Sequence, residues 1–287
     1  MGSERRRLAG DARRLAVLGK PIEHSKSPAL HAAAYGVLGL DWTYTSIEVD
    51  GAGLPELLAG LDASWRGLSL TMPLKQDVIP LVERIDRVAS LTGAVNTVLF
   101  EADGRRLGFN TDVGGIVRAL HEAGVDRVGR GAILGAGATA ASVLAAIAEL
   151  GCHEVDVFVR TPARAEPLVI LGRALDVEVR VAEDGLAALA RAGAADLVVS
   201  TVPGGTELPH EASVDLRRAA TLFDVAYDPW PSRLATSWLD AGGRVVPGIG
   251  MLLHQAVLQV RIFVTGDPGT PLPDEAAVVD VMRAAVA

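Results

Sequence analysis

The hydrophobic pattern of the first third of the chain predicts alternating strands and helices. The apolar run Leu15–Gly19 has the length of a short buried strand. Ser27, read as an N-cap with Pro28 in the first helical position, predicts a helix that ends near Leu38. Further elements are a strand at 43–49, a helix at 54–61 and a strand at 67–71. Strands interleaved with helices indicate an α/β domain with a mostly parallel sheet.

A second alternation begins near Arg130 and predicts a Rossmann-type, doubly wound sheet. The strand 132–134 leads directly into a glycine-rich turn, and an alanine-rich helix follows and ends at Gly151. Further strands are expected at 155–159, 196–201, 222–225 and 244–246. The last long helical segment, Met251 to about Val264, has no strand of its own. We therefore expect the C-terminal helices to pack back on the first domain and close the cleft between the two domains.

These patterns predict two α/β domains. We expect residues 1–112 and 248–287 to form a substrate-binding and catalytic domain, and residues 113–247 to form a Rossmann-type nucleotide-binding domain. A length of 287 residues fits two domains of about 100–200 residues each.

Composition and charge exclude several classes of protein. With 49% hydrophobic and 22% charged residues the chain can bury a substantial core, and no apolar run reaches the roughly 18 residues that cross a bilayer. Residues 1–14 are rich in arginine but have no apolar segment typical of a secretory signal. The single cysteine, Cys152, excludes an internal disulfide and suits a reducing cytoplasm. A net charge of −8 argues against general nucleic-acid binding.

The turn after the strand 132–134 matches the dinucleotide fingerprint, with alanine in the permitted last place. Gly135 allows the tight turn, Gly137 lets backbone amides approach a pyrophosphate, and Ala140 allows close packing of helix and strand. The positive end of the helix dipole then faces the phosphates. We assign six residues of this loop to cofactor binding: Gly135, Ala136, Gly137, Ala138, Thr139 and Ala140.

The end of the next strand indicates which cofactor binds. An NAD enzyme carries Asp or Glu there, about 20 residues after the glycines, to bind the ribose 2′-hydroxyl, and Asp156 lies too early, in the middle of the strand. The chain instead carries Arg160, Thr161 and Arg164. Guanidinium groups suit a 2′-phosphate, so we predict NADP(H). The alternative interpretation is that these are solvated arginines at a helix start.

Two further segments offer polar groups for a substrate. The hydroxyls of Ser25 and Ser27 converge with the first amides of a helix, which makes a niche for a carboxylate. The alternative is that Ser27 only caps its helix and Ser25 is a loop residue. Lys75, after a strand end, and Asp112 could form a proton-transfer pair for a ketone reduced by NADPH. Spacing alone does not show that these two residues meet, and each could be an ordinary surface charge.

In this order, the motifs above resemble those of the shikimate dehydrogenase family, together with Asp224–Pro229 and Gly248–Ala256. The resemblance spans about Leu18 to Gly266. It implies an oxidoreductase that reversibly reduces 3-dehydroshikimate to shikimate with NADPH, a step of chorismate and aromatic amino-acid biosynthesis. We expect a monomer or homodimer without nucleic-acid or membrane partners.

The resemblance also implies roles for individual residues. Ser25 and Ser27 hold the substrate carboxylate, and Lys75 and Asp112 are the catalytic pair. The family's hydroxyl-binding and ring-contacting positions are Thr71, Asn96, Gln255 and Tyr227. Arg160, Thr161 and Arg164 match its 2′-phosphate motif, although Val159 replaces the usual asparagine and Ala138 a usual glycine. The same resemblance adds Thr201, Val225 and Gly248 to the cofactor site.

Three other hypotheses remain open at this stage. Two are enzymes: a quinate/shikimate dehydrogenase, and a dehydrogenase of an amino analogue of shikimate. The third is a non-catalytic ligand-binding protein on the same scaffold. The serine pair favours shikimate, because quinate-preferring relatives often alter it, and the presence of Lys75 and Asp112 argues against a binder. His24, His31 and His254 show no metal-ligand spacing, which favours structural roles.

Overall fold

The structure is a computed structural model that describes residues 12–182, 188, 195–208 and 210–287. Residues 1–111 with 255–287 form one compact unit, and residues 112–254 form a second. The predicted boundaries lie at residues 112 and 248, so the second differs by seven residues along helix α10 (Ile249–Thr265). Residues 249–254 of α10 belong to the second unit and the rest of the helix to the first. Residues 1–11 of the arginine-rich N-terminal stretch lie outside the described residues.

The first unit contains a six-stranded mixed sheet in the order β2-β1-β3-β5-β6-β4. The parallel pairs are β1 with β2, β1 with β3, and β4 with β6, while β5 runs antiparallel to β3 and β6. Its strands are β1 (Arg13–Gly19), β2 (Trp42–Glu48), β3 (Trp65–Leu70), β4 (Arg84–Ile85), β5 (Thr97–Phe100) and β6 (Arg106–Phe109). The predicted α/β class is confirmed, and the antiparallel hairpin β5–β6 accounts for the departure from a purely parallel sheet.

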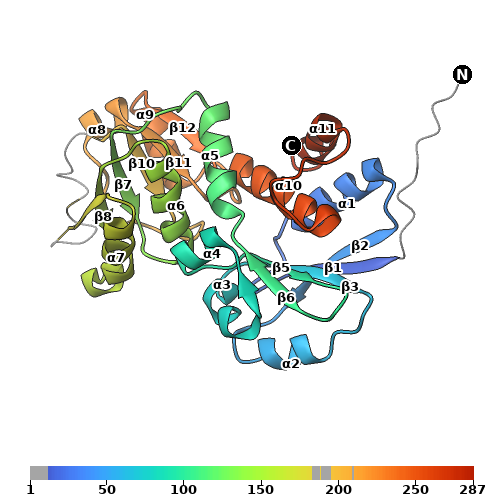
Figure 1. The fold of residues 1–287 in the computed structure, drawn as a ribbon. Helices are drawn as coiled ribbons and strands as arrows, with labels where there is room; N and C mark the ends of the chain where they lie inside the picture. Colours follow the sequence, from blue (N-terminus) through green and yellow to red (C-terminus); the bar gives the residue numbers. More distant parts are fainter. Residues whose placement is uncertain (1–11, 183–187, 189–194, 209) are drawn as a thin grey trace, which may run out of the picture. The chain divides into compact units, whose positions relative to one another are not determined.

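Helices cover both faces of this sheet (Figure 1). They are α1 (Ser27–Leu38), α2 (Leu54–Ala59), α3 (Leu74–Asp77), a 3₁₀ turn (Ile79–Leu81), α4 (Arg87–Thr92), the C-terminal part of α10 and α11 (Glu275–Ala284). The start of α1 differs from the prediction, because Lys26 is the N-cap and Ser27 is already helical, with no side-chain cap. The Ser25 hydroxyl instead accepts a hydrogen bond from the Ser27 amide at 3.3 Å.

Alternation along β3 explains how its two faces differ. Leu68 and Leu70 pack with Leu54 and Leu74 in the core under α2 and α3. On the opposite face, a Cβ added to Gly67 would lie 2.4 Å from Phe263 Cε1 of α10 and 2.5 Å from the Val98 carbonyl oxygen. The close approach of α10 to the sheet therefore requires glycine at position 67.

Replacing Gly67 with alanine should lower the free energy of unfolding by about 1–3 kcal/mol, the usual cost of overpacking a core. Gly36→Ala is the matched control, because Gly36 is an exposed position of α1 with no atom within 4 Å of an added Cβ. That control should be neutral or stabilising by about 0.5–1 kcal/mol. Chemical denaturation of both variants measures the difference, and equal stabilities would contradict the proposed packing.

The second unit contains a parallel six-stranded sheet in the order β12-β11-β10-β7-β8-β9. Numbered within this unit, its strand order is the 3-2-1-4-5-6 arrangement of a Rossmann fold. The strands are β7 (Arg130–Leu134), β8 (Glu154–Phe158), β9 (Glu178–Val181), β10 (Leu197–Ser200), β11 (Thr221–Asp224) and β12 (Arg244–Pro247). The predicted Rossmann-type sheet is confirmed.

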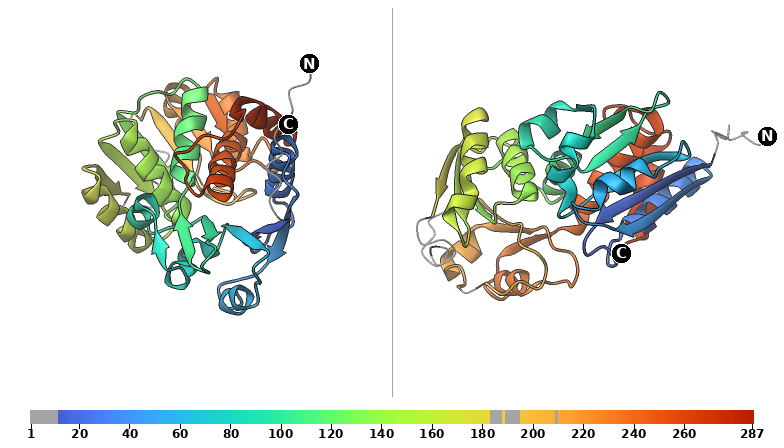
Figure 2. Two further views of the ribbon diagram at one scale, coloured as in Figure 1. Left: turned by 45° about the vertical axis from the view of Figure 1, so that its right-hand side comes forward. Right: turned by 90° about the horizontal axis from the view of Figure 1, so that it is seen from below.

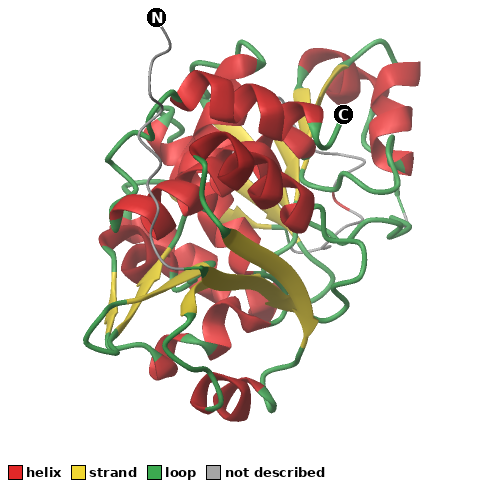
Figure 3. Cartoon of the chain, turned by 90° about the vertical axis from the view of Figure 1, so that its right-hand side faces the viewer, coloured by secondary structure: helices red, strands yellow, loops and turns green. Residues whose placement is uncertain are grey.

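Helices lie on both faces of the second sheet, as the further views show (Figures 2 and 3). They are α5 (Asp112–Glu122), α6 (Ala138–Glu149), a 3₁₀ turn (Pro162–Ala165), α7 (Glu166–Ala174), α8 (Val214–Ala219) and α9 (Arg233–Asp240). On one face, Leu216 of α8 and Trp238 of α9 share a core cluster with Leu134, Val198 and Leu222 of the strands. The central strands β7, β10 and β11 are thus almost wholly buried, as their apolar sequences require.

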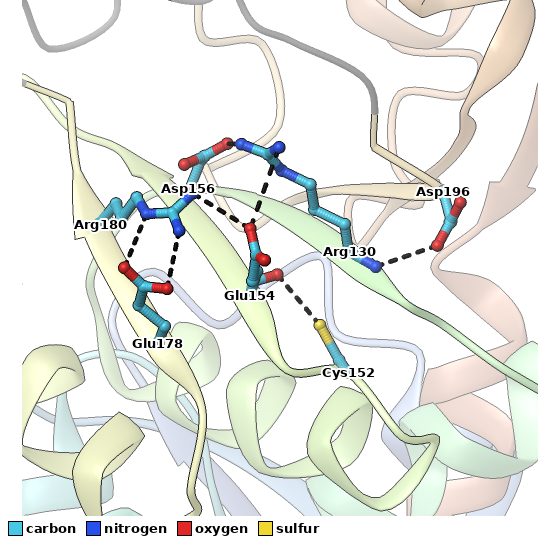
Figure 4. Close-up of polar contacts among 7 residues, drawn as sticks. All are labelled: Arg130, Cys152, Glu154, Asp156, Glu178, Arg180 and Asp196. Atoms are coloured by element: carbon cyan, nitrogen blue, oxygen red, sulfur yellow. Dashed lines mark hydrogen bonds and ion pairs between the residues drawn. The ribbon is translucent and has the colours of Figure 1, made fainter.

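Charged residues link the neighbouring strands β7, β8 and β9 (Figure 4). Arg130 pairs with Asp156 at 2.8 Å, and Arg180 pairs with Glu154 at 3.1 Å and with Glu178 at 2.7 Å. The Asp156 carboxylate of β8 is therefore paired with Arg130 of the neighbouring strand β7. This agrees with the sequence argument that Asp156 does not bind a cofactor ribose.

Candidate active and cofactor sites

In the second unit, the predicted cofactor residues follow the C-terminal ends of strands, either directly or within six residues. Gly135 directly follows β7, and Arg160 lies two residues beyond the end of β8. Thr201, Val225 and Gly248 directly follow β10, β11 and β12. Because the strands are parallel, these five strand ends lie at one edge of the sheet, where open α/β sheets bind ligands.

Gly135 occupies the point where the strand order reverses, between β7 and β10. Its φ of +106° lies in a region that L side chains rarely adopt, and an added Cβ would lie 2.5 Å from Thr201 Oγ1. The Thr201 hydroxyl in turn donates a hydrogen bond to the Leu134 carbonyl at 2.8 Å. Thr201 therefore fixes the turn from the neighbouring strand, and only glycine fits opposite it.

Gly137 has the opposite surroundings. It is the N-cap of α6, its backbone is extended, and nothing lies within 4 Å of an added Cβ. The first turn of α6 carries no acidic residue, and Ala140 is fully buried against the sheet. The loop therefore presents backbone amides and a positive helix end to open space, which fits the phosphates of a dinucleotide.

A pair of glycine variants separates these two roles. Gly135→Ala should lower the free energy of unfolding by at least about 1–2 kcal/mol, because it forces a left-handed residue and a clash with Thr201. Gly137→Ala should cost less than about 1 kcal/mol, since its backbone conformation is open to any residue. Thermal unfolding without ligand measures both, and a Gly137 variant as unstable as the Gly135 variant would contradict the open loop.

The residues beyond β8 also have room for a ligand. Arg160, Thr161 and Arg164 are exposed, and neither arginine forms an ion pair with another residue that the structure describes. Val159, at the position where the family pattern has asparagine, is buried and 6% exposed. Both guanidinium groups therefore remain available for a phosphate, whereas Val159 is not.

Two other predicted site residues belong to the second unit. Asp112 is the first residue of α5 and is 3% exposed. Tyr227 follows β11 and is half-buried, and burial and then the nearby Asp228 charge raise the pKa of its phenol. Gly248 is packed tightly there, because an added Cβ would lie 2.2 Å from the Val225 carbonyl oxygen.

In the first unit, the predicted substrate residues gather at one edge of the sheet. Ser25 and Ser27 follow β1, and Thr71 and Lys75 follow β3. Asn96 directly precedes β5, which is antiparallel to β3, so that the start of β5 lies beside the end of β3. The backbone confirms this proximity, since the Leu70 amide donates to the Asn96 carbonyl at 2.8 Å.

The backbone around Lys75 is fixed by short hydrogen bonds. Leu74 is fully buried, and its amide donates to the Thr71 carbonyl at 2.8 Å. The Val95 amide donates to the Lys75 carbonyl at 2.8 Å. The backbone of the half-buried Lys75 is therefore held beside Val95, the residue that precedes Asn96.

The Asn96 side chain is 2% exposed and lies in a polar cluster. Its Oδ1 accepts from the Thr111 amide at 2.9 Å and from the Thr97 hydroxyl at 2.9 Å. Its Nδ2 donates to Thr111 Oγ1 at 2.9 Å and to Gln255 Oε1 at 3.4 Å. The structure thus brings together two of the predicted hydroxyl-binding residues, Asn96 and Gln255.

Several buried polar residues of this cluster were not predicted from the sequence. Gln259 Oε1 lies 2.9 Å from the Ser69 hydroxyl and 3.2 Å from His31 Nε2. The His31 ring stacks on Tyr44 at a centroid distance of 3.9 Å, and the Tyr44 hydroxyl donates to Ser69 at 2.7 Å. Gln259 recurs four residues after Gln255, one helical turn on, and that spacing was the available signal.

His31 is neutral in this environment. The ring is fully buried, and desolvation lowers its pKa to about 3, although the hydrogen bond with Gln259 acts in the opposite direction. Its other nitrogen, Nδ1, lies 3.0 Å from the Tyr35 hydroxyl. The structural role expected for His31 therefore has a defined set of partners.

Among the described residues, no group of three or more His, Cys, Asp or Glu side chains could hold a metal ion. Within the same residues, no helix combines the length and apolar character that a membrane span requires.

Comparison with known proteins tests the family resemblance. The family model "Shikimate dehydrogenase substrate binding domain" matches residues 17–98. A relative from Rubrobacter xylanophilus named shikimate dehydrogenase (NADP(+)) is 38% identical over 270 residues, which cover 91% of this chain and 94% of that protein. The chain belongs to the shikimate dehydrogenase family.

Solved structures agree with this assignment. A shikimate 5-dehydrogenase from Thermus thermophilus, in complex with NADP(H) and shikimate, is 32% identical with a TM-score of 0.78, covering 95% of this chain and 99% of that chain. A quinate dehydrogenase from Corynebacterium glutamicum in complex with NAD is 29% identical with a TM-score of 0.81, covering 96% of this chain and 100% of that chain. The resemblance inferred from the motifs is therefore confirmed.

Proposed function

We propose that this protein is an NADP-dependent oxidoreductase that reversibly reduces 3-dehydroshikimate to shikimate. The proposal rests on one observation: in each unit, the motif residues lie together at one edge of the sheet. In the second unit, the cofactor residues follow five strand ends. In the first unit, Ser25, Thr71, Lys75 and Asn96 lie at one edge of the other sheet. Family membership supplies the reaction that these groups serve.

The residues of the first unit provide the groups that a polyhydroxy acid needs. Ser25 and Ser27 supply hydroxyls beside the start of α1, where the positive helix end favours a carboxylate. Thr71, Asn96 and Gln255 supply hydroxyl and amide groups for the ring hydroxyls. Tyr227, from the second unit, is proposed to lie close to the ring. The serine pair favours shikimate over quinate or an amino analogue.

Lys75 and Asp112 are proposed to transfer the proton. The bound nicotinamide supplies or accepts the hydride. In the direction of reduction, the ammonium of Lys75 stabilises the developing alkoxide and donates a proton to it, and Asp112 orients that ammonium. A protein that only bound shikimate would not need this pair, which argues against the non-catalytic hypothesis.

The loop from Gly135 to Ala140 is proposed to hold the pyrophosphate through backbone amides at the start of α6. Arg160, Thr161 and Arg164 are proposed to bind the 2′-phosphate. Their exposure, and the commitment of Asp156 to Arg130, support NADP(H) over NAD. Thr201, Val225 and Gly248 complete this edge of the sheet beside the nicotinamide. A cytoplasmic location and a monomeric or homodimeric state complete the proposal.

Initial rates with a panel of substrates and cofactors test this assignment. Shikimate with NADP+ should be oxidised far faster than shikimate with NAD+ or quinate with either cofactor. Arg160→Ala should raise the Michaelis constant for NADP+ about 10- to 100-fold, as expected for a lost charge-assisted phosphate contact, and leave that for NAD+ unchanged. Arg173→Ala, an exposed arginine of α7, is the control that removes the same charge elsewhere. Equal rates with both cofactors, or a preference for quinate, would contradict the proposal.

Replacing Lys75 with alanine should lower kcat by roughly 10²–10⁴-fold, the usual contribution of a general acid. Shikimate should still bind, because its carboxylate and hydroxyl contacts remain. Lys20→Ala is the control, since Lys20 is an exposed lysine of the same unit that pairs with Asp50 at 3.0 Å. Near-normal turnover of the Lys75 variant would show that another group transfers the proton.

A further inference from the structure

The polar cluster around Asn96 contains two side-chain amides whose orientations are fixed by backbone groups. The Asn96 carbonyl can only accept a hydrogen bond, so the atom of Gln259 that faces it at 3.2 Å must be Nε2. Gln259 Oε1 then faces His31 and Ser69. In the same way, the Thr111 amide can only donate, so the atom of Asn96 that faces it at 2.9 Å must be Oδ1.

The Thr97 hydroxyl joins these two amides. Thr97 Oγ1 accepts from Gln259 Nε2 at 3.0 Å, and it lies 2.9 Å from Asn96 Oδ1. Since a hydroxyl has only one proton and Oδ1 has none, Thr97 must donate to Asn96. Thr97 and Gln259 are 0% and 2% exposed, so water does not compete for these bonds.

The partners behind Gln259 keep this direction fixed. His31 is neutral because burial lowers its pKa to about 3, and it therefore has one ring proton to place. With Gln259 Oε1 beside Nε2, that proton lies on Nε2, and Nδ1 accepts from the Tyr35 hydroxyl. Ser69 donates to the same Oε1 at 2.9 Å. Reversing the Gln259 amide would therefore break the bonds to His31 and Ser69.

We propose that Thr97 is a positioning residue, which receives a hydrogen bond from Gln259 and donates its own proton to Asn96 Oδ1. The Asn96 amide is thereby held with Nδ2 toward Thr111 Oγ1 and Gln255 Oε1. Thr97 therefore fixes which side of the Asn96 amide faces Gln255, the other buried residue proposed to bind ring hydroxyls. This inference rests on the proposed function, in which Asn96 binds a ring hydroxyl of shikimate.

Thr97→Val tests this role, because valine keeps the shape of threonine and loses only the hydroxyl. We expect the Michaelis constant for shikimate to rise about three- to tenfold, the range of one net hydrogen bond. The turnover number should change less than twofold, because a hydroxyl contact away from the reacting carbon is equal in ground and transition states. The Michaelis constant for NADP+ should not change. Thr97→Ser, which restores a hydroxyl, should recover the wild-type value.

Thr92→Val is the matched control. Thr92 is also a buried threonine of the first unit, and its hydroxyl likewise contacts an asparagine, since Asn110 Nδ2 donates to it at 3.0 Å. Its own proton goes to the Val88 carbonyl at 2.8 Å. Thr92→Val should lose comparable stability and leave the Michaelis constant for shikimate within twofold of the wild type.

A double-mutant comparison separates this inference from the proposed function. If Thr97 acts through Asn96, adding Thr97→Val to Asn96→Ala should raise the Michaelis constant for shikimate no further. An equal effect of Thr97→Val and Thr92→Val, or additive effects of the Asn96 and Thr97 changes, would overturn the positioning role alone. A wild-type protein that does not oxidise shikimate with NADP+ would overturn both.

Discussion

Parallel strands end at a common edge of their sheet, and both proposed sites depend on this constraint. In the second unit, five neighbouring strands, from β12 across to β8, end at one edge of the sheet. In the first unit, β5 runs antiparallel to β3, so Asn96 reaches the same edge from the start of its strand instead of the end. Strand pairing therefore brings residues that are far apart in the sequence to the same edge of a sheet.

The two edges are built by different physics. At the edge proposed to bind the nucleotide, the important feature is space near the backbone. Thr201 leaves no space for a side chain at Gly135, and Gly137 faces open space. At the edge proposed to bind the substrate, the important feature is that the polar groups are saturated with hydrogen bonds, because buried polar groups need partners. Asn96, Thr97 and Gln259 satisfy one another through hydrogen bonds of 2.9–3.2 Å. Open backbone suits a phosphate, whereas a saturated cluster holds its side chains in fixed orientations.

The sequence predicts those parts of the structure that rest on local chemistry. A tight turn at Gly135 and strands of apolar residues can be recognised in any chain, and every strand predicted in the second unit is present. The edge strand β9 was not predicted, because charged residues alternate with valine along it. The start of α1 was placed one residue late, because Ser25, two residues before Ser27, provides the acceptor that the first amide needs. Local pattern does not reveal which of two nearby serines performs that role.

The buried network could not be predicted in the same way. Ser69 and Thr97 face each other across β3 and β5, and Gln259 of α10 joins them, 190 residues after Ser69 and 162 after Thr97. Their pairing depends on strand register and on the packing of α10, and Gly67 allows that close packing. Residue chemistry makes Lys75, Asp112 and the serine pair candidates with alternatives open, the family resemblance chooses between those alternatives, and their roles stay predictions.

The central claim is that this protein converts shikimate chemically and does not only bind it. The most direct measurement follows purified protein with shikimate and NADP+ to equilibrium, with NADPH recorded by absorbance and the organic product identified by NMR. We expect 3-dehydroshikimate and NADPH to form in equal amounts. Binding of shikimate without formation of NADPH, or NADPH formed with a different organic product, would contradict it.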